Sequence, residues 1–350
     1  MTVEDAAGGN IPFVRQPQGP KFFLKTWSGR IIIVNIIVFA LMALQSHSLL
    51  MPTDEIILKF GAKDPVSIAL GEYFRFFTPM FVHIGFVHFA FNTWALYVFA
   101  YQLEHLFGEK FFLALYLTAG VMGNIASSVF TLALSAGASG ALFGLLGAGF
   151  TVERLFRRKL ERATGQKYRS GMYTVMVVGN LILGLVIPQI DNAAHIGGLI
   201  SGMVLAVAFL KITKNPLMVS DKKAGIILLI LLFIAGAGGA VIAASPGILE
   251  KRIDHAVETA EVPQLRFIHI SDGLRLNPEN NELRYERVRM VLLSGKKEMA
   301  AEDIKILKEK PEYSKKLRSL ADEFADVGYF DLAIWLRERT DDAGSSPTQP

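Results

Sequence analysis

Ser139 has the residue type and the local setting needed for nucleophilic catalysis. It lies in the string SAGASGALFGLLGAG, between Gly137 and Gly140, where an apolar run begins. A serine at the start of a helix is close to unpaired backbone N–H groups, which can hold an oxyanion. The same serine could instead be a plain N-cap in a glycine-rich packing helix, because serine is a favoured cap.

His195 lies near the start of another apolar run, DNAAHIGGLISG, with Gly198 and Gly202 on the same helix face. A similar spacing of small residues follows Ser139. Small residues at this spacing let helices approach closely in lipid. Such an approach is needed for a serine hydroxyl to come within ~3 Å of a histidine nitrogen. We therefore predict that Ser139 is a nucleophile and His195 its general base. Taken alone, His195 could also be a hydrogen-bonded histidine of a helix bundle.

The run FRFFTPMFVHIGFVHFAFNTWALYVFA carries three further polar residues. His88 and Asn92 are four residues apart and share one face of a helix, whereas His83 is about 140° away on an ideal helix and should point elsewhere. Hydrogen bonds between helices would also explain the pair. Two histidines and an asparagine without a nearby carboxylate make a poor zinc site, and the chain has no cysteine. We therefore predict no metal and no cofactor.

Composition indicates the elements that must position these side chains. Of the 350 residues, 51% are hydrophobic and 19% are charged, which is typical of a membrane protein. Seven apolar runs are candidate spans: 31–44, 74–103, 111–134, 137–152, 171–188, 193–210 and 224–244. The first is short enough to resemble the core of a signal peptide, but no convincing small-residue cleavage site follows it, so we expect a retained span. The later six are near the length that crosses a bilayer, although 137–152 is short. The segment 46–73 is amphipathic and too polar to cross, so we expect it at the outer membrane surface.

Lysine and arginine in the short loops predict the orientation of these spans. The basic residues of 21–30, 154–169 and 211–223 fall on one side of the membrane if seven spans alternate. The positive-inside rule makes that side cytoplasmic. The N-terminus is then inside and everything after residue 244 outside. The net positive charge lies in this membrane half, so we attribute it to topology and expect no nucleic-acid partner.

At the candidate residues the sequence resembles the rhomboid family of intramembrane serine proteases. The matching motifs are GASG around Ser139, AAH ending at His195, H-x4-H-x3-N from His83 to Asn92, and the strings EYFRFFTP and LEHLFG. The resemblance covers about residues 30–212 and implies a core of six transmembrane helices. A seventh span and a helical tail are an elaboration seen in some bacterial members, which implies a multi-pass protein of the plasma (inner) membrane.

The resemblance also implies roles for single residues. Ser139 and His195 correspond to a catalytic dyad without a third acidic member, so Asp191 is interpreted as a cap or loop residue. His88 and Asn92 correspond to residues whose side chains donate hydrogen bonds to the oxyanion. The backbone N–H of Ser139 is expected to be a third donor.

Other residues have supporting roles by the same resemblance. Phe143 is expected to stack on the imidazole of the general base, and His83 to organise access of water. Gly137 and Gly140 support the nucleophile, and Glu104 and Arg75 match structural positions.

The predicted fold class is an all-α polytopic membrane protein with a small soluble α-helical C-terminal domain. We expect a disordered cytoplasmic N-terminus at 1–29, the protease core at 30–212, a cytoplasmic loop and seventh span at 213–245, an extracytoplasmic helical domain at 246–342 and a disordered tail at 343–350. The helical domain resembles degenerate tetratricopeptide (TPR) repeats, although a plain helical bundle would fit nearly as well. It could recruit substrates or protein partners, or be a passive stabilising domain.

These observations predict an intramembrane serine endopeptidase that works in the lipid bilayer. By the resemblance, its substrates are transmembrane or juxtamembrane segments of other membrane proteins. Two alternatives stay open. The chain could be a catalytically silent binder of unstable transmembrane helices, or its polar span residues could line a transport path.

Overall fold

The computed structural model describes residues 25–164, 171–187, 189–212 and 221–340. Within these ranges every named element is a helix, and several helices are apolar enough to cross a membrane. The prediction of an all-α polytopic membrane protein is therefore confirmed. Residues 1–24 and 341–350, which include most of the two predicted disordered ends, lie outside the described residues. The chain divides into two compact units, Met1–Ser245 and Pro246–Pro350.

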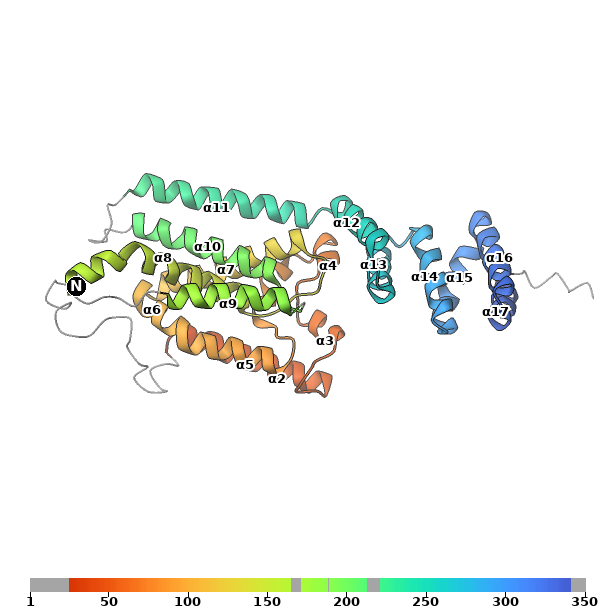
Figure 1. Cartoon of the computed structure of the whole chain (residues 1–350), viewed down its shortest axis with the longest axis horizontal. Coiled ribbons are helices and arrows are strands. Elements are labelled where there is room, and N and C mark those ends of the chain that lie inside the picture. The colour runs from red at the N-terminus through yellow and green to blue at the C-terminus, as the bar shows by residue number, and fades with distance from the viewer. Residues whose placement is uncertain (1–24, 165–170, 188, 213–220, 341–350) are drawn as a thin grey trace, which may run out of the picture. The chain divides into compact units, whose positions relative to one another are not determined.

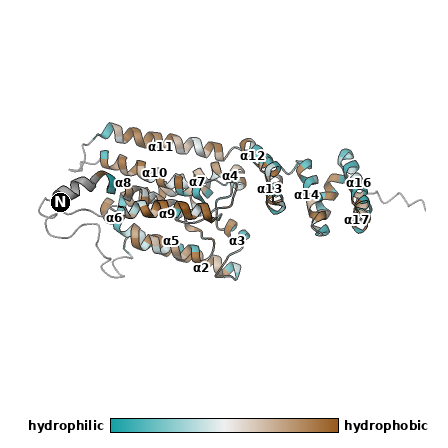
Figure 2. Cartoon of the chain, viewed as in Figure 1, coloured by the Kyte–Doolittle hydropathy of each residue, from teal (hydrophilic) through white to brown (hydrophobic). Residues whose placement is uncertain are grey.

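The helices of the first unit carry long apolar stretches (Figures 1 and 2). Four of the described helices are long and apolar enough to span a bilayer: α2 (Trp27–Ser46), α7 (Glu109–Phe130), α10 (Asn192–Ile212) and α11 (Lys222–Ala243). Two more lie among them, α8 (Ser139–Thr164, 26 residues) and the shorter α9 (Met172–Val186, 15 residues). Many apolar side chains of α2, α9 and α11 are exposed, which suits helices that face lipid.

Helix α8 lies at the centre of this unit, where it packs against α7 and α10. Every residue from 141 to 149 is buried. Small residues make this possible, because a Cβ atom on Gly144 would lie 2.1 Å from the Cβ of Ala119 in α7. Close packing of backbones through glycine and alanine is the usual way in which helices associate in membranes.

The second span begins later than the apolar run in the sequence suggests. Residues 73–81 form two 3-10 turns, η3 (Tyr73–Phe76) and η4 (Thr78–Phe81), and α5 (Phe86–Ala95) starts only after Gly85, whose φ is 91°. Proline at position 79 and a glycine in a conformation that favours glycine both interrupt a helix. The span continues through a π-helical turn, η5 (Leu96–Ala100), into α6 (Tyr101–Phe107).

The amphipathic segment before this span folds into a packed layer. It contains α3 (Asp54–Lys59) and α4 (Pro65–Ala69), whose residues Ile57, Val66 and Ile68 are buried. The Arg75 guanidinium joins this segment to the start of the second span. Its Nη1 donates to the carbonyl oxygens of Leu58 and Ala62, both at 2.8 Å. These bonds agree with the structural position that the sequence resemblance implies for Arg75.

Glu104 connects the second span to the first. Its carboxylate is 2% exposed and accepts hydrogen bonds from the backbone N–H of Trp27 at 2.7 Å, the backbone N–H of Ser28 at 2.9 Å and the hydroxyl of Ser28 at 2.8 Å. These are the N–H groups that a helix start leaves unpaired, and a negative charge there also interacts favourably with the helix dipole. Glu104 therefore caps α2 from another helix.

The second unit consists of consecutive helices that pack mainly on their neighbours in sequence. They are α12 (Pro246–Thr259), α13 (Pro263–Leu276), α14 (Asn281–Leu293), a 3-10 turn η6 (Lys297–Ala300), α15 (Ala301–Lys308), α16 (Pro311–Asp326) and α17 (Phe330–Thr340). Hydrophilic and hydrophobic residues alternate along these helices (Figure 2). Buried Asp303 accepts two hydrogen bonds of 2.7 Å from the Arg287 guanidinium. Stacked helix pairs occur in TPR arrays and in other helical stacks, so the TPR assignment stays a prediction.

Candidate active site

Ser139 is the first residue of α8 and is half-buried. The chain enters the helix through Gly137, whose φ of 135° is a conformation that L side chains rarely adopt. The N–H of Gly137 donates to the carbonyl oxygen of Pro79 at 2.9 Å, which fixes the approach of the chain. The predicted helix start at this serine is thus present, with the unpaired N–H groups of a first helical turn beside its hydroxyl.

His195 lies in the first turn of α10 and is 6% exposed. Its imidazole stacks on the Phe143 ring, with centroids 4.0 Å apart and planes inclined by 11°. Phe143 is one turn after Ser139 in α8, so this stack links the serine helix to the histidine. The imidazole Nδ1 is buried and has no hydrogen-bond partner among the described residues.

Glycines bring the first turns of these two helices into backbone contact. A Cβ atom on Gly198 would lie 2.0 Å from the carbonyl oxygen of Gly140, and one on Gly202 would lie 2.0 Å from that of Gly144. Gly140 directly follows Ser139, and Gly198 is one turn after His195. The small-residue faces predicted on the two runs therefore meet each other, at the level of the serine and the histidine.

His88 and Asn92 lie in α5, half-buried and buried respectively. The His88 imidazole borders the approach to the serine, since a Cβ atom on Gly137 would lie 2.5 Å from its Cε1. The Asn92 amide donates to the His88 carbonyl oxygen at 2.9 Å. One of its two N–H groups is thus used within its own helix, and the other is available to a ligand.

His83 precedes α5 instead of lying on it, so the helical argument that it points away from His88 does not apply. It is fully buried, and its ring lies edge-on to that of His88, with centroids 5.4 Å apart. Sequence spacing misplaced it because Gly85 breaks the helix between the two histidines. His83 therefore packs behind the ring that borders the serine loop.

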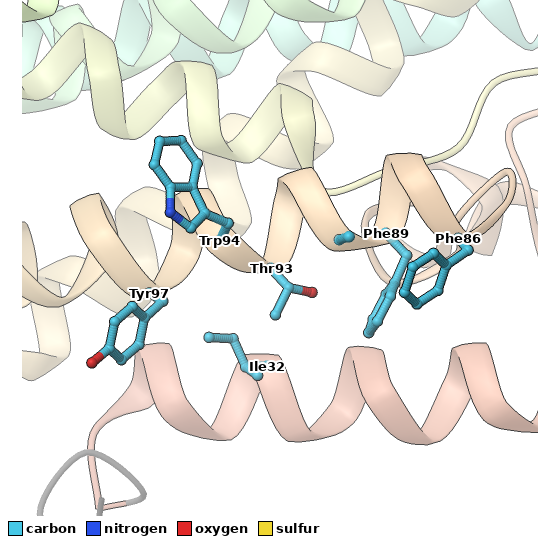
Figure 3. Close-up of a pocket in the computed structure, with 7 residues that line it drawn as sticks. Ile32, Phe86, Phe89, Thr93, Trp94 and Tyr97 are labelled. Carbon is cyan, nitrogen blue, oxygen red and sulfur yellow. The ribbon is translucent and has the colours of Figure 1, made fainter. Parts of the chain in front are cut away.

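A cavity of about 440 Å³ lies between α2 and α5 (Figure 3). Figure 3 shows Phe89, Thr93 and Trp94 on one helix and Ile32 on the other. The lining is almost wholly apolar and includes none of Ser139, His195, His88 and Asn92. Without a nucleophile or a base, this cavity is not the chemical site.

Two charged residues lie near the site. Lys63 is fully buried and was not predicted, because its segment reads as a membrane-surface stretch. Asp191 is half-buried and accepts hydrogen bonds from the Ser127 hydroxyl and the Ala194 N–H, the second of which agrees with the predicted role as a cap. A single lysine in the mostly apolar string GAKDPVSIAL is the sequence signal for Lys63.

The matches to known proteins fall on the first unit. A family model described as the Rhomboid domain matches residues 70–212. Rhomboid protease GluP of Bacillus subtilis is 40% identical over 183 residues, which are 52% of this chain and 34% of GluP. RHOMBOID-like protein 1 of Arabidopsis thaliana is 35% identical over 178 residues, 49% of this chain and 44% of that protein.

The match to a shorter relative covers most of that relative's length. The rhomboid family protein YdcA of Bacillus subtilis is 31% identical over 179 residues, which are 50% of this chain and 84% of YdcA. The chain spans only about a third to a half of the length of GluP and the Arabidopsis protein. With the Rhomboid domain match and the relative covered over most of its length, this chain is a member of the rhomboid family.

Proposed function

We propose that this chain is an intramembrane serine endopeptidase that cleaves transmembrane or juxtamembrane segments of membrane proteins through a dyad of Ser139 and His195. The observation that carries the proposal is the backbone contact between Gly140 and Gly198, which brings the first turns of α8 and α10 together. The name of GluP, a rhomboid protease, adds support from a relative. We assign the catalytic core to residues 30–212.

In this mechanism the hydroxyl oxygen of Ser139 attacks the scissile carbonyl carbon, and its proton passes to Nε2 of His195. The tetrahedral oxyanion is stabilised by the N–H of Ser139 and by donors from His88 and Asn92. The C–N bond then breaks, and the proton moves from the imidazolium to the leaving amine. Water attacks the acyl-enzyme ester while the imidazole takes its proton. The ester C–O bond then breaks, the imidazolium returns the proton to the serine oxygen, and the acid product and free serine are released.

Two features support a dyad over a triad. The Nδ1 atom of His195 is buried without a partner among the described residues, so no carboxylate orients the ring by a hydrogen bond. The Asp191 oxygens are instead occupied by the Ser127 hydroxyl and the Ala194 N–H. The stacked Phe143 ring would orient the imidazole in place of an acid.

The test is cleavage of a model transmembrane substrate in liposomes by the wild type, Ser139→Ala and His195→Ala, with fluorophosphonate labelling of the same proteins. The expected result is cleavage and labelling by the wild type alone. Folded wild type that neither labels nor cleaves any of several helix-destabilised substrates would overturn the proposal. Binding of such helices without cleavage, unchanged in Ser139→Ala, would favour a catalytically silent binder.

A further inference from the structure

Lys63 holds the segment that leads from α7 to Ser139. Its backbone pairs with that of Ser135, with N–H···O distances of 2.8 and 3.0 Å in the two directions. Its ammonium donates to the Thr131 hydroxyl at 3.0 Å and to the Ala133 carbonyl oxygen at 2.6 Å. Three of the five residues from 131 to 135 therefore bind one fully buried lysine, a few residues before the nucleophile.

Asp191 holds the start of the helix that carries His195. It directly precedes α10, and one carboxylate oxygen accepts from the Ala194 N–H at 2.9 Å, as an N-cap does. The other oxygen accepts from the hydroxyl of Ser127 in the last turn of α7. The Ser127 and Thr131 hydroxyls are 3.4 Å apart, so the groups bound by Lys63 and by Asp191 touch each other.

Charge complementarity supports the same connection. Burial raises the pKa of Asp191, but the positive charge of Lys63, the hydroxyls of Ser127 and Ser135 and the N–H of Ala194 outweigh it, so that its pKa lies below the ordinary value of 3.8. Asp191 is thus ionised at neutral pH. A fully buried ammonium is costly alone, and the nearby half-buried carboxylate offsets part of that cost.

We propose that Lys63 and Asp191 are positioning residues of the dyad: by binding the Ser127–Thr131 hydroxyl pair from two sides, they fix the segment before Ser139 relative to the first turn of α10. This inference rests on the proposed function. Neither residue forms a hydrogen bond with the imidazole Nδ1, which has no partner among the described residues. They act through the backbone segments that carry the nucleophile and the base.

Two variants remove one charge each with little change of shape. Lys63→Met keeps the apolar stem, and Asp191→Asn keeps a side chain that caps a helix. For each we expect kcat to fall about 10- to 100-fold, with KM within about two-fold of the wild type, because small misplacements of reacting groups reduce the rate more than binding. Fluorophosphonate labelling of Ser139 should slow in parallel. The double variant should be no slower than the worse single variant, since both act through one link.

The matched control is Asp303→Asn in the second unit, which removes the buried carboxylate that pairs with the Arg287 guanidinium. It should lower the unfolding temperature and leave kcat unchanged. If Lys63→Met and Asp191→Asn behave in the same way, with loss of stability but wild-type kcat and labelling per folded molecule, the inference is overturned.

Hydrogen exchange gives a readout that does not depend on protease activity. The link predicts cross-effects, so Lys63→Met should speed exchange in residues 192–198, and Asp191→Asn should speed it in residues 131–138. Asp303→Asn should change neither. If each variant speeds exchange only in the segment that contains or directly binds the mutated residue, the proposed link is overturned, even if the wild type cleaves. If exchange speeds up in the opposite segment but the wild type does not cleave, the link is supported and the proposed protease function is rejected.

Discussion

The Phe143 ring lies flat against the His195 imidazole, at 4.0 Å and 11°. Because the imidazole Nδ1 has no partner among the described residues, this ring orients the imidazole by packing. We expect Phe143→Ala to lower kcat about ten-fold, since a base that is free to rotate spends less time in line with the serine. The measurement is steady-state cleavage in liposomes.

Phe150→Ala is the control for that variant. Phe150 is two turns further along α8 and packs against the apolar core of the first unit, but its ring faces the Arg154 guanidinium. It should cost stability without a comparable loss of kcat. Equal kcat losses in the two variants would show that packing volume in α8, and not the stack, sets the rate.

Gly198 offers a sharper steric test. A Cβ atom there would lie 2.0 Å from the Gly140 carbonyl oxygen, which a real structure does not tolerate, so Gly198→Ala must push α10 away from α8. Cleavage should fall at least ~100-fold and the unfolding temperature should drop. Gly238→Ala in α11, where a Cβ atom meets nothing within 4 Å, should have wild-type activity. Normal cleavage by Gly198→Ala would contradict the helix contact on which the site depends.

Glu104 is expected to contribute chiefly to stability. Glu104→Ala removes a buried acceptor of three hydrogen bonds and leaves the Trp27 and Ser28 N–H groups without it. A loss of about 2–4 kcal/mol in the free energy of unfolding follows from the cost of unpaired buried donors. Glu109→Ala, an exposed acid in the first turn of α7, should cost under about 1 kcal/mol. Denaturant unfolding in mixed micelles compares them.

The pKa of Asp191 gives a dependence of stability on pH. Because its folded pKa is lowered below 3.8, its ionised form adds stability above that value, and this stability is lost as the pH falls through the folded pKa. The gap in unfolding temperature between the wild type and Asp191→Asn should be constant from about pH 5 to 8 and should narrow below about pH 4. A gap that widens in acid would mean that the carboxyl is neutral in the folded protein.

The absence of cysteine allows a direct test of orientation, for which the positive-inside rule predicts an extracytoplasmic second unit. Ser294→Cys, at an exposed position of that unit, should react with a membrane-impermeant maleimide on intact cells. Lys222→Cys, exposed at the start of α11, should react only after permeabilisation. The reverse pattern would invert the proposed topology.

The sequence predicted the helices and the backbone at the site better than the polar network around them. Ser139 at a helix start and the meeting of glycine faces follow from local spacing, which a sequence displays directly. The hydrophobic run predicts a start of the second span that is too early. Apolar residues such as Phe74 continue the run, whereas Pro79 and Gly85 prevent a continuous helix before α5 begins. Lys63 was missed because its partners Thr131 and Ala133 are 68 and 70 residues away, beyond the reach of any periodicity.

The cap on α2 has a consequence for biosynthesis. The acceptor of the Trp27 N–H is Glu104, 77 residues further along the chain. During synthesis at the ribosome the first span therefore enters the membrane with its leading amides exposed, and only water at the interface can solvate them. Its insertion is completed when the second span arrives with the missing carboxylate. The first span therefore lacks this carboxylate until the chain has been made as far as Glu104, which couples completion of its start to the arrival of the second span.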